Sequence, residues 1–180
     1  MKNRILVCYA TKYGATEEIA REIGKTLHEA GLAVDVIPVI AVTDLKPYRA
    51  VIIGSPIYMG KWLHESAQFV RDHRVALSHR EVAAFAVGYS LKDRLEEHLR
   101  NADRAIDAIR LYVEPVDVAL FAGRIIPDTM SAADRAILTL GGVKPGDFRD
   151  WDEIRAWAGK LAERLGKQFR SSPGHDPGLS

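Results

Sequence analysis

The chain has 180 residues, of which 47% are hydrophobic and 27% are charged, values typical of a globular domain. Lys and Arg total 25 and Asp and Glu total 24, so the formal net charge is +1 and no global field favours nucleic acid or an anionic membrane. The single cysteine, Cys8, excludes an internal disulfide and fits a reducing compartment.

The termini and the hydrophobic runs predict a cytoplasmic protein. The start of the chain lacks the pattern of a secretory signal, and no apolar run approaches the ~20 residues that span a bilayer. Residues 171–180 (SSPGHDPGLS) have little to bury and are expected to form a flexible tail after a single domain over residues 1–170. We therefore expect no transmembrane segment, with peripheral membrane association left open.

Along the chain, continuous hydrophobic segments alternate with amphipathic segments. Strands are predicted for five segments: 4–9, 33–38, 50–54, 82–87 and 116–122. Helical periodicity predicts four longer helices: 15–30, 62–77, 91–112 and 151–166. Residues 123–150 contain a short predicted helix at 131–140 and are interpreted as a surface insertion before the last helix.

This alternation predicts an α/β fold in three layers, with a five-stranded parallel sheet between helices on both faces. In such open sheets, ligands bind outside the carboxyl ends of the strands, where the strand order reverses. The loops after residues 9, 54, 87 and 122 are therefore the places to look for a site.

The first of these loops, Thr11-Lys12-Tyr13-Gly14-Ala15-Thr16, joins a buried strand to a helix. The first N–H groups of that helix lack partners and carry the positive end of its dipole, so they favour a phosphate. Thr11 and Thr16 add hydroxyls, Gly14 permits a close turn, and Lys12 either lends charge or lies in solvent. The alternative is that a threonine caps the helix and Gly14 is only a turn residue.

Several other phosphate sites are excluded. There is no Gly-Lys-Ser/Thr for a nucleoside triphosphate loop, and the single glycine of the first loop does not make a dinucleotide fingerprint. Cys8 lies inside a predicted strand, as a core residue would, rather than opening a thiol phosphatase loop. Ala10 and Ser55 stand where a phosphoacceptor receiver domain has acidic residues, so the sequence does not fit that class of protein.

The six histidines are scattered along the sequence, so no metal site is expected.

Two further loops place aromatic residues at the same edge of the sheet. One is Ser55-Pro56-Ile57-Tyr58-Met59-Gly60, followed by Trp62, and the other is Gly88-Tyr89-Ser90. Large flat side chains at strand ends suggest a planar ligand, although Met59 and Trp62 could instead pack under the following helix. Together the three loops predict a site for a flat ring with a phosphate tail.

The sequence resembles the flavodoxin family over nearly its whole length. The loop at residues 11–16 is similar to the family pattern T-x-[ST]-G-x-T, with Tyr13 in place of a small hydroxyl residue. The resemblance implies strand order 2-1-3-4-5, bound FMN, and a flavin ring between the loops at 55–60 and 88–93. It also implies that a backbone carbonyl near residues 55–60 accepts a hydrogen bond from the reduced flavin.

Within the family, the chain looks most like the protoporphyrinogen dehydrogenase branch. The shared segments are VIIGSPIYMGKWLHESAQFV, ALFAGRI and GDFRDWDEIRAWA, with an insertion before the last helix. Bacterial members of that branch have a strongly basic insertion, whereas residues 123–150 of this chain balance basic and acidic side chains. Electron-carrier flavodoxins are strongly acidic, whereas this chain as a whole is near neutral. The resemblance implies an FMN-dependent oxidoreductase of a porphyrinogen, with a quinone or a redox protein as partner. The alternatives are an electron carrier for a protein partner and a domain without flavin.

Overall fold

The computed structural model describes residues 3–171, so the predicted tail lies outside it except for Ser171, which belongs to the last helix. The strands are β1 (Arg4–Tyr9), β2 (Ala33–Pro38), β3 (Tyr48–Tyr58), β4 (Lys61–Trp62), β5 (Glu81–Gly88), β6 (Asp117–Ala122), β7 (Arg124–Ile125) and β8 (Gly146–Asp147). The helices are α1 (Ala15–Glu29), α2 (His64–Asp72), α3 (Arg74–Leu77), α4 (Glu96–Ala105), α5 (Asp107–Arg110), α6 (Ala132–Leu140) and α7 (Trp151–Ser171), with 3₁₀ turns at Val39–Ala41, Tyr89–Asp93 and Pro127–Thr129.

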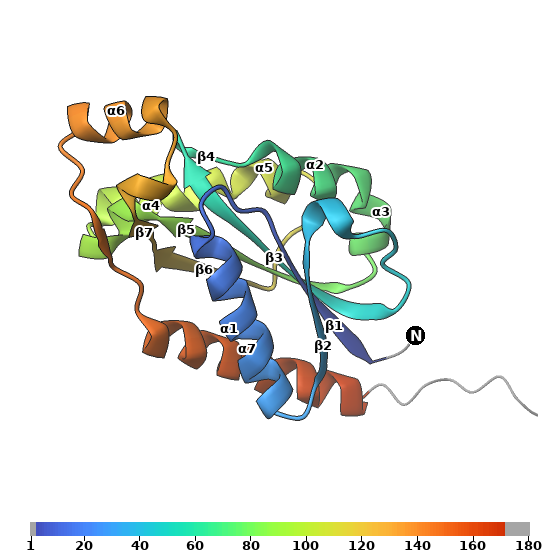
Figure 1. Cartoon of the computed structure of the whole chain (residues 1–180). Coiled ribbons are helices and arrows are strands. Elements are labelled where there is room, and N and C mark those ends of the chain that lie inside the picture. The colour runs from blue at the N-terminus through green and yellow to red at the C-terminus, as the bar shows by residue number, and fades with distance from the viewer. Residues whose placement is uncertain (1–2, 172–180) are drawn as a thin grey trace, which may run out of the picture.

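A parallel sheet in the order β2-β1-β3-β5-β6 forms the middle layer (Figure 1). In sequence order its five long strands follow the predicted layout 2-1-3-4-5, which is confirmed. β1 pairs with β2 on one side and β3 on the other, so residues 5–8 are fully buried. This central position explains why the sequence of β1 is a continuous apolar run. Cys8 is confirmed as a core residue, and burial raises the pKa of its thiol.

Helices cover both faces of this sheet. α1 and α7 pack on one face through the apolar stripes that the sequence showed, including Ile19, Ile23 and Leu27 of α1. On the other face lie Phe69 and Val70 of α2 together with Ile106 and Ile109 around α5. Each such side chain contributes about 1.5–3 kcal/mol when fully buried. These two apolar layers hold the strand ends, and hence the loops that follow them, in a rigid frame.

Two predicted helices are shorter and more broken than expected. The segment 62–77 divides at His73 into α2 and α3, and the segment 91–112 divides into a 3₁₀ turn, α4 and α5. Arg94, which ends the 3₁₀ turn two residues before α4, takes a left-handed conformation with φ of 55°. Hydrophobic periodicity is insensitive to such local breaks, because the apolar positions stay in phase on both sides of them.

The third strand is longer than predicted and changes the nature of the second loop. β3 continues through Ser55–Tyr58 and turns back into β4 at Met59 and Gly60, whose φ values are 50° and 75°. Two consecutive residues with positive φ are typical of a tight type I′ hairpin turn. Trp62 is consequently buried in the core, 5% exposed, whereas Met59 is 78% exposed. The packing alternative is right for Trp62 and wrong for Met59.

Residues 123–150 lie at the carboxyl end of the sheet. They form β7, a 3₁₀ turn, α6 and β8, with β7 antiparallel to β8, and α6 stands beyond the strand ends (Figure 1).

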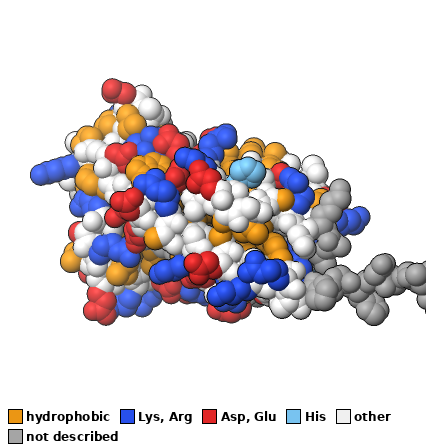
Figure 2. Space-filling model, turned by 90° about the horizontal axis from the view of Figure 1, so that it is seen from below, with side chains coloured by type: hydrophobic (Ala, Val, Ile, Leu, Met, Phe, Trp, Pro, Cys, Tyr) orange, Lys and Arg blue, Asp and Glu red, His pale blue; other side chains and the backbone are white. Residues whose placement is uncertain are grey.

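The surface of the molecule carries both signs of charge. Viewed from below, acidic and basic side chains are interspersed over the surface (Figure 2), as the balanced composition predicts. Among residues 3–171, no helix combines the length and apolarity that crossing a bilayer requires.

Candidate active site at the carboxyl edge of the sheet

The loops after β1, β3 and β5 converge with the insertion on a cavity of about 320 Å³. A cavity of this size is within the usual range for small-ligand sites. Eleven of the residues predicted for the site line it: Thr11, Lys12, Tyr13, Ala15, Thr16, Pro56, Ile57, Tyr58, Met59, Gly88 and Tyr89. The sequence therefore located the cavity, because parallel strands present their carboxyl ends at one edge.

The first loop has the geometry of an anion cradle. Gly14 is left-handed with φ of 87°, and its N–H donates to the Thr11 hydroxyl at 2.9 Å. No side chain caps α1, so capping by Thr11 or Thr16 is not observed. The Thr16 hydroxyl is buried, 1% exposed, and has no hydrogen-bond partner among the described residues. A buried polar atom without a partner is costly, and an anion at the N-terminus of α1 would satisfy it.

Asp134 of α6 joins the first loop to the end of β3. Its carboxylate forms an ion pair with Lys12 at 2.9 Å and accepts hydrogen bonds from the hydroxyls of Tyr13 and Tyr58, the latter at 2.6 Å. Asp134 is only 6% exposed. The Tyr13 hydroxyl, followed by Tyr58 and Lys12, holds the pKa of this carboxyl well below its usual range. We refer to Asp134 and these three partners as the latch.

The latch also fixes the orientation of Tyr58. The Lys12 ammonium lies over the Tyr58 ring, 3.6 Å from its centroid, so one face of the ring is covered. Tyr13, the unusual residue of the first loop, points to the start of α6, where its hydroxyl accepts a hydrogen bond from the Ser131 N–H at 3.3 Å. Its role in the structure is therefore to connect the loop to the insertion.

The second aromatic wall is also held by the insertion. The Tyr89 hydroxyl accepts a hydrogen bond from the Lys144 N–H at 3.2 Å, and its ring meets Phe148 edge to face at 5.5 Å. Tyr58 and Tyr89 thus line one cavity from different strand ends, and a different part of residues 123–150 supports each ring.

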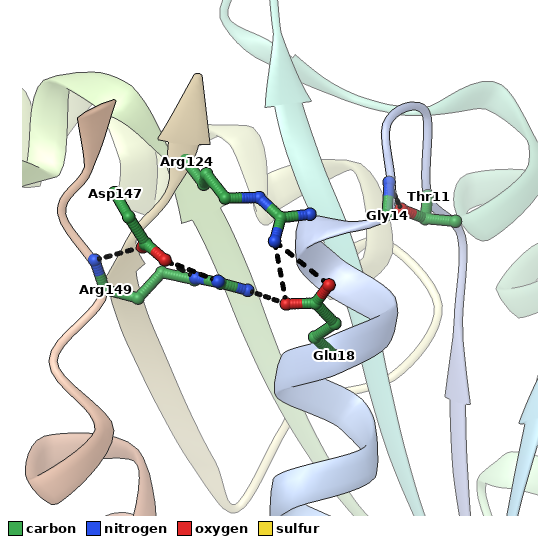
Figure 3. A network of polar contacts seen from close by, with 6 residues as sticks. All are labelled: Thr11, Gly14, Glu18, Arg124, Asp147 and Arg149. Carbon is green, nitrogen blue, oxygen red and sulfur yellow. Dashed lines mark hydrogen bonds and ion pairs between the residues drawn. The ribbon is translucent and has the colours of Figure 1, made fainter. Parts of the chain in front are cut away.

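A cluster of four charges borders the first loop (Figure 3). Glu18, in the first turns of α1, is paired with Arg124 at 3.0 Å and with Arg149 at 2.5 Å, and Arg149 also pairs with Asp147 at 2.6 Å. Burial alone would raise the pKa of the Glu18 carboxyl, but Arg149 and Arg124 hold it below its ordinary value. The cluster attaches both ends of the insertion to α1.

Four predicted residues do not line the cavity: Gly14, Ser55, Gly60 and Ser90. Ser55 is fully buried, and its hydroxyl accepts from the Leu63 N–H and donates to the Pro56 carbonyl, both at 2.9 Å. That hydroxyl supports the hairpin of β3 and β4. Gly14 and Gly60 act through backbone conformation, both with positive φ, and Ser90 is exposed in the 3₁₀ turn after β5.

Sequence reasoning missed eight lining residues: Val87, Gly123, Arg124, Ile125, Met130, Asp134, Ile137 and Leu138. All except Val87 belong to the insertion, which lies at the surface as interpreted but also forms a wall of the cavity. Residues 131–134 read Ser-Ala-Ala-Asp, and the Ser131 hydroxyl accepts from the Asp134 N–H at 3.1 Å. That pattern signals the start of a helix. Nothing in the sequence shows that the Asp134 carboxylate turns into the cavity.

The chain is a doubly wound α/β protein with a cavity at the switch point of its sheet, bordered by the N-terminus of α1 and by two aromatic walls, the place where such folds bind nucleotides. A family model described as "Flavodoxin domain" matches residues 6–141, and the chain belongs to this family. FMN is accordingly the cofactor, as the resemblance to the flavodoxin family implied. No curated protein sequence matches the chain.

Solved structures agree with this fold. A flavodoxin from the domain Archaea superposes with a TM-score of 0.57 at 19% identity, covering 91% of this chain and 99% of that one. The flavodoxin of Streptococcus pneumoniae TIGR4 gives 0.58 at 19% identity, covering 92% and 99%. Rubredoxin oxygen:oxidoreductase from Desulfovibrio gigas gives 0.57 at 16% identity and covers 93% of this chain but 38% of that one. At these identities the likeness concerns the fold.

Proposed function

We propose that the chain binds FMN in this cavity and acts as an FMN-dependent oxidoreductase. The observation that carries the proposal is the buried, unpartnered hydroxyl of Thr16 at the N-terminus of α1, inside a cavity with two aromatic walls. In this proposal Thr11, Thr16 and the N–H groups of residues 12–16 surround the phosphate, and Gly14 permits its close approach. The loops at residues 55–60 and 88–90 flank the ring.

The side chains of the cavity would position the ring and exclude water. FMN, when bound, supplies the transfer of electrons. Lys12 covers one face of Tyr58, so the opposite face is the one that can meet a flat ligand. Asp134 and Lys12 compensate each other's charge, so the walls near Tyr58 add little net field. A site of low polarity disfavours extra negative charge on the ring, which would lower its reduction potential.

For the substrate, we propose a reduced tetrapyrrole macrocycle of the protoporphyrinogen type. The proposal is based on the three segments that resemble the protoporphyrinogen dehydrogenase branch and on an insertion that builds part of the cavity wall. Apolar side chains are exposed around the insertion, among them Leu140 at 90% and Ile137 at 52%. Such surface is suited to an apolar substrate or to a quinone as electron acceptor.

The second candidate is an electron carrier for a protein partner. Met59 lies at the cavity and is 78% exposed at the tip of the β3–β4 hairpin, where a docking protein could reach the cofactor. The near-neutral composition does not provide the strong charge that steers many redox partners, so such docking would depend on apolar contact.

Anaerobic reduction of the purified flavoprotein separates the two candidates. Protoporphyrinogen is added to the oxidised protein, and the visible flavin absorbance is followed. Bleaching at a rate that depends on protoporphyrinogen concentration supports the oxidoreductase. A flavin that stays oxidised with protoporphyrinogen, while a flavodoxin reductase reduces it rapidly, identifies a carrier. A protein that shows no flavin absorbance after FMN is added and the unbound FMN is removed by gel filtration refutes both.

Replacing Thr16 by valine should change stability and flavin affinity in opposite directions. Without flavin, the variant is expected to be about 1 kcal/mol more stable, because the unpartnered buried hydroxyl is removed. Its affinity for FMN should fall about tenfold, because a phosphate contact is lost. Urea unfolding of the flavin-free protein and a fluorescence titration with FMN measure the two effects.

Thr26→Val on the same helix is the matched control. The Thr26 hydroxyl donates to the Glu22 carbonyl at 3.0 Å, so this variant removes a satisfied group far from the cavity. It should gain no stability and should bind FMN as the unmodified chain does. A Thr16→Val variant that loses stability and binds FMN normally would contradict the assignment of Thr16 to the phosphate.

A further inference from the structure

Arg124 places a guanidinium group beside the first loop (Figure 3). The residue follows the last strand of the main sheet and lines the cavity, and its side chain is 18% exposed. Its Nη1 atom lies 3.0 Å from each carboxylate oxygen of Glu18. Within residues 3–171, its Nε and Nη2 atoms make no hydrogen bond, so part of its donor fork is available.

The available edge of Arg124 lies next to the turn at Gly14. A Cβ atom placed on Gly14 would be 3.7 Å from Nη2 of Arg124, nearer than any other neighbouring side chain. The same turn leads into the unpartnered N–H groups of α1 and to the buried hydroxyl of Thr16. Cationic, amide and hydroxyl donors therefore gather around one position at the edge of the cavity.

Glu18 does not need Arg124 as a partner. Arg149, whose side chain is only 4% exposed, already pairs with Glu18 and with Asp147. The cluster contains two arginines and two carboxylates, so it is neutral without a ligand. A phosphate bound close to Glu18 would be repelled by its carboxylate unless a cation lay between the two groups. Arg124 lies in that position, because Nη1 contacts Glu18 and Nη2 is next to the turn at Gly14.

We propose that Arg124 is a phosphate-binding residue of the flavin site, held by Glu18 and donating through its remaining N–H groups to the phosphomonoester. This inference rests on the proposed function and deepens it, because it assigns to the insertion a role in selecting a phosphorylated flavin. Arginine suits this role, since its planar fork matches phosphate oxygens and keeps its charge at all physiological pH values.

Arg124→Gln tests the proposal when the affinities for FMN and for riboflavin, which lacks the phosphate, are both measured by fluorescence titration. FMN should bind about 10- to 100-fold more weakly, the effect of losing one charge-assisted hydrogen bond. Riboflavin affinity should stay within about twofold, which also shows that the ring site is folded. Arg124→Lys, which keeps the charge without the fork, should give an intermediate affinity for FMN.

Arg155→Gln is the matched control. Arg155 pairs with Glu22, one turn further along α1, at 3.1 Å, and it does not line the cavity. This variant removes the same charge and a similar ion pair, and it should bind both flavins normally. Equal losses for FMN and riboflavin in Arg124→Gln, or no loss for either, would overturn the assignment of Arg124 while the proposed function stands. An unmodified chain that binds neither flavin would overturn both.

Discussion

Replacing Gly54 by alanine is expected to destabilise the protein by about 3 kcal/mol, the upper part of the usual cost of overpacking. Gly54 lies in β3 directly opposite Phe85 of β5. A Cβ atom on Gly54 would come within 2.0 Å of the Phe85 ring. Phe85 is fully buried and packs against Phe121 and Trp157, with centroids 6.2 and 6.3 Å away, so the ring cannot easily move aside.

Two companion variants make this expectation specific. Gly159→Ala in the interior of α7, where nothing lies within 4 Å of the new Cβ, should stabilise the protein by about 0.5–1 kcal/mol. Combining Gly54→Ala with Phe85→Leu should cost less than the sum of the two single changes, because the smaller side chain makes room. Urea denaturation measures the unmodified protein, the three single variants and the double variant. Additive costs, or a Gly54→Ala protein as stable as the unmodified chain, would refute the proposed clash.

Replacing Asp134 by asparagine is expected to loosen α6 from the sheet. The change removes the charge that pairs with Lys12 and weakens the hydrogen bonds from Tyr13 and Tyr58. Hydrogen bonds to a charged group contribute about 1.5–3 kcal/mol, while the half-exposed Lys12 adds less because water screens it. Amide exchange over residues 132–140 should therefore accelerate about 10- to 100-fold, measured by hydrogen–deuterium exchange.

Asp128→Asn is the control for this variant, because Asp128 is exposed in the same insertion and has no hydrogen bond or ion pair with another described residue. It should leave the exchange of α6 unchanged. Equal exchange in the two variants would show that Asp134 does not hold the helix. The same would follow if Asp134→Asn accelerated exchange evenly throughout the chain.

The latch should also respond to acid in a definite direction. The carboxyl of Asp134 has a pKa below its ordinary value in the folded protein, so the folded state holds this proton less tightly than the unfolded chain. Its stabilising contribution is therefore complete above the ordinary aspartate pKa of about 4 and is lost as the pH falls towards the lowered value. The protection factor of the α6 amides, which corrects for the pH dependence of intrinsic exchange, should be unaffected by Asp134 between pH 7 and 5 and should fall only at more acidic pH.

Much of the fold could be predicted because the relevant signals are local. Fully buried strands produce unbroken apolar runs, and the helices that cover them produce apolar stripes. The same signals placed the ends of β1, β3 and β5 at one edge, so eleven predicted residues line the cavity. Local signals could not show that β3 continues through Tyr58, since that extension depends on pairing with β4 across a tight turn.

The amino-acid sequence by itself determined the parallel α/β architecture and placed the loop at residues 11–16, together with Tyr58 and Tyr89, at the cavity. Only the tertiary structure decided what residues 123–150 do. Asp134 and Arg124 are separated from the first loop by more than a hundred residues, as their contacts with Tyr13 and Glu18 show. Sequence patterns record which face of an element is buried, whereas the partner of a buried charge depends on how distant elements pack. For this reason the sequence indicated only that the insertion lies at the surface, and the tertiary structure showed that it also forms a wall of the cavity.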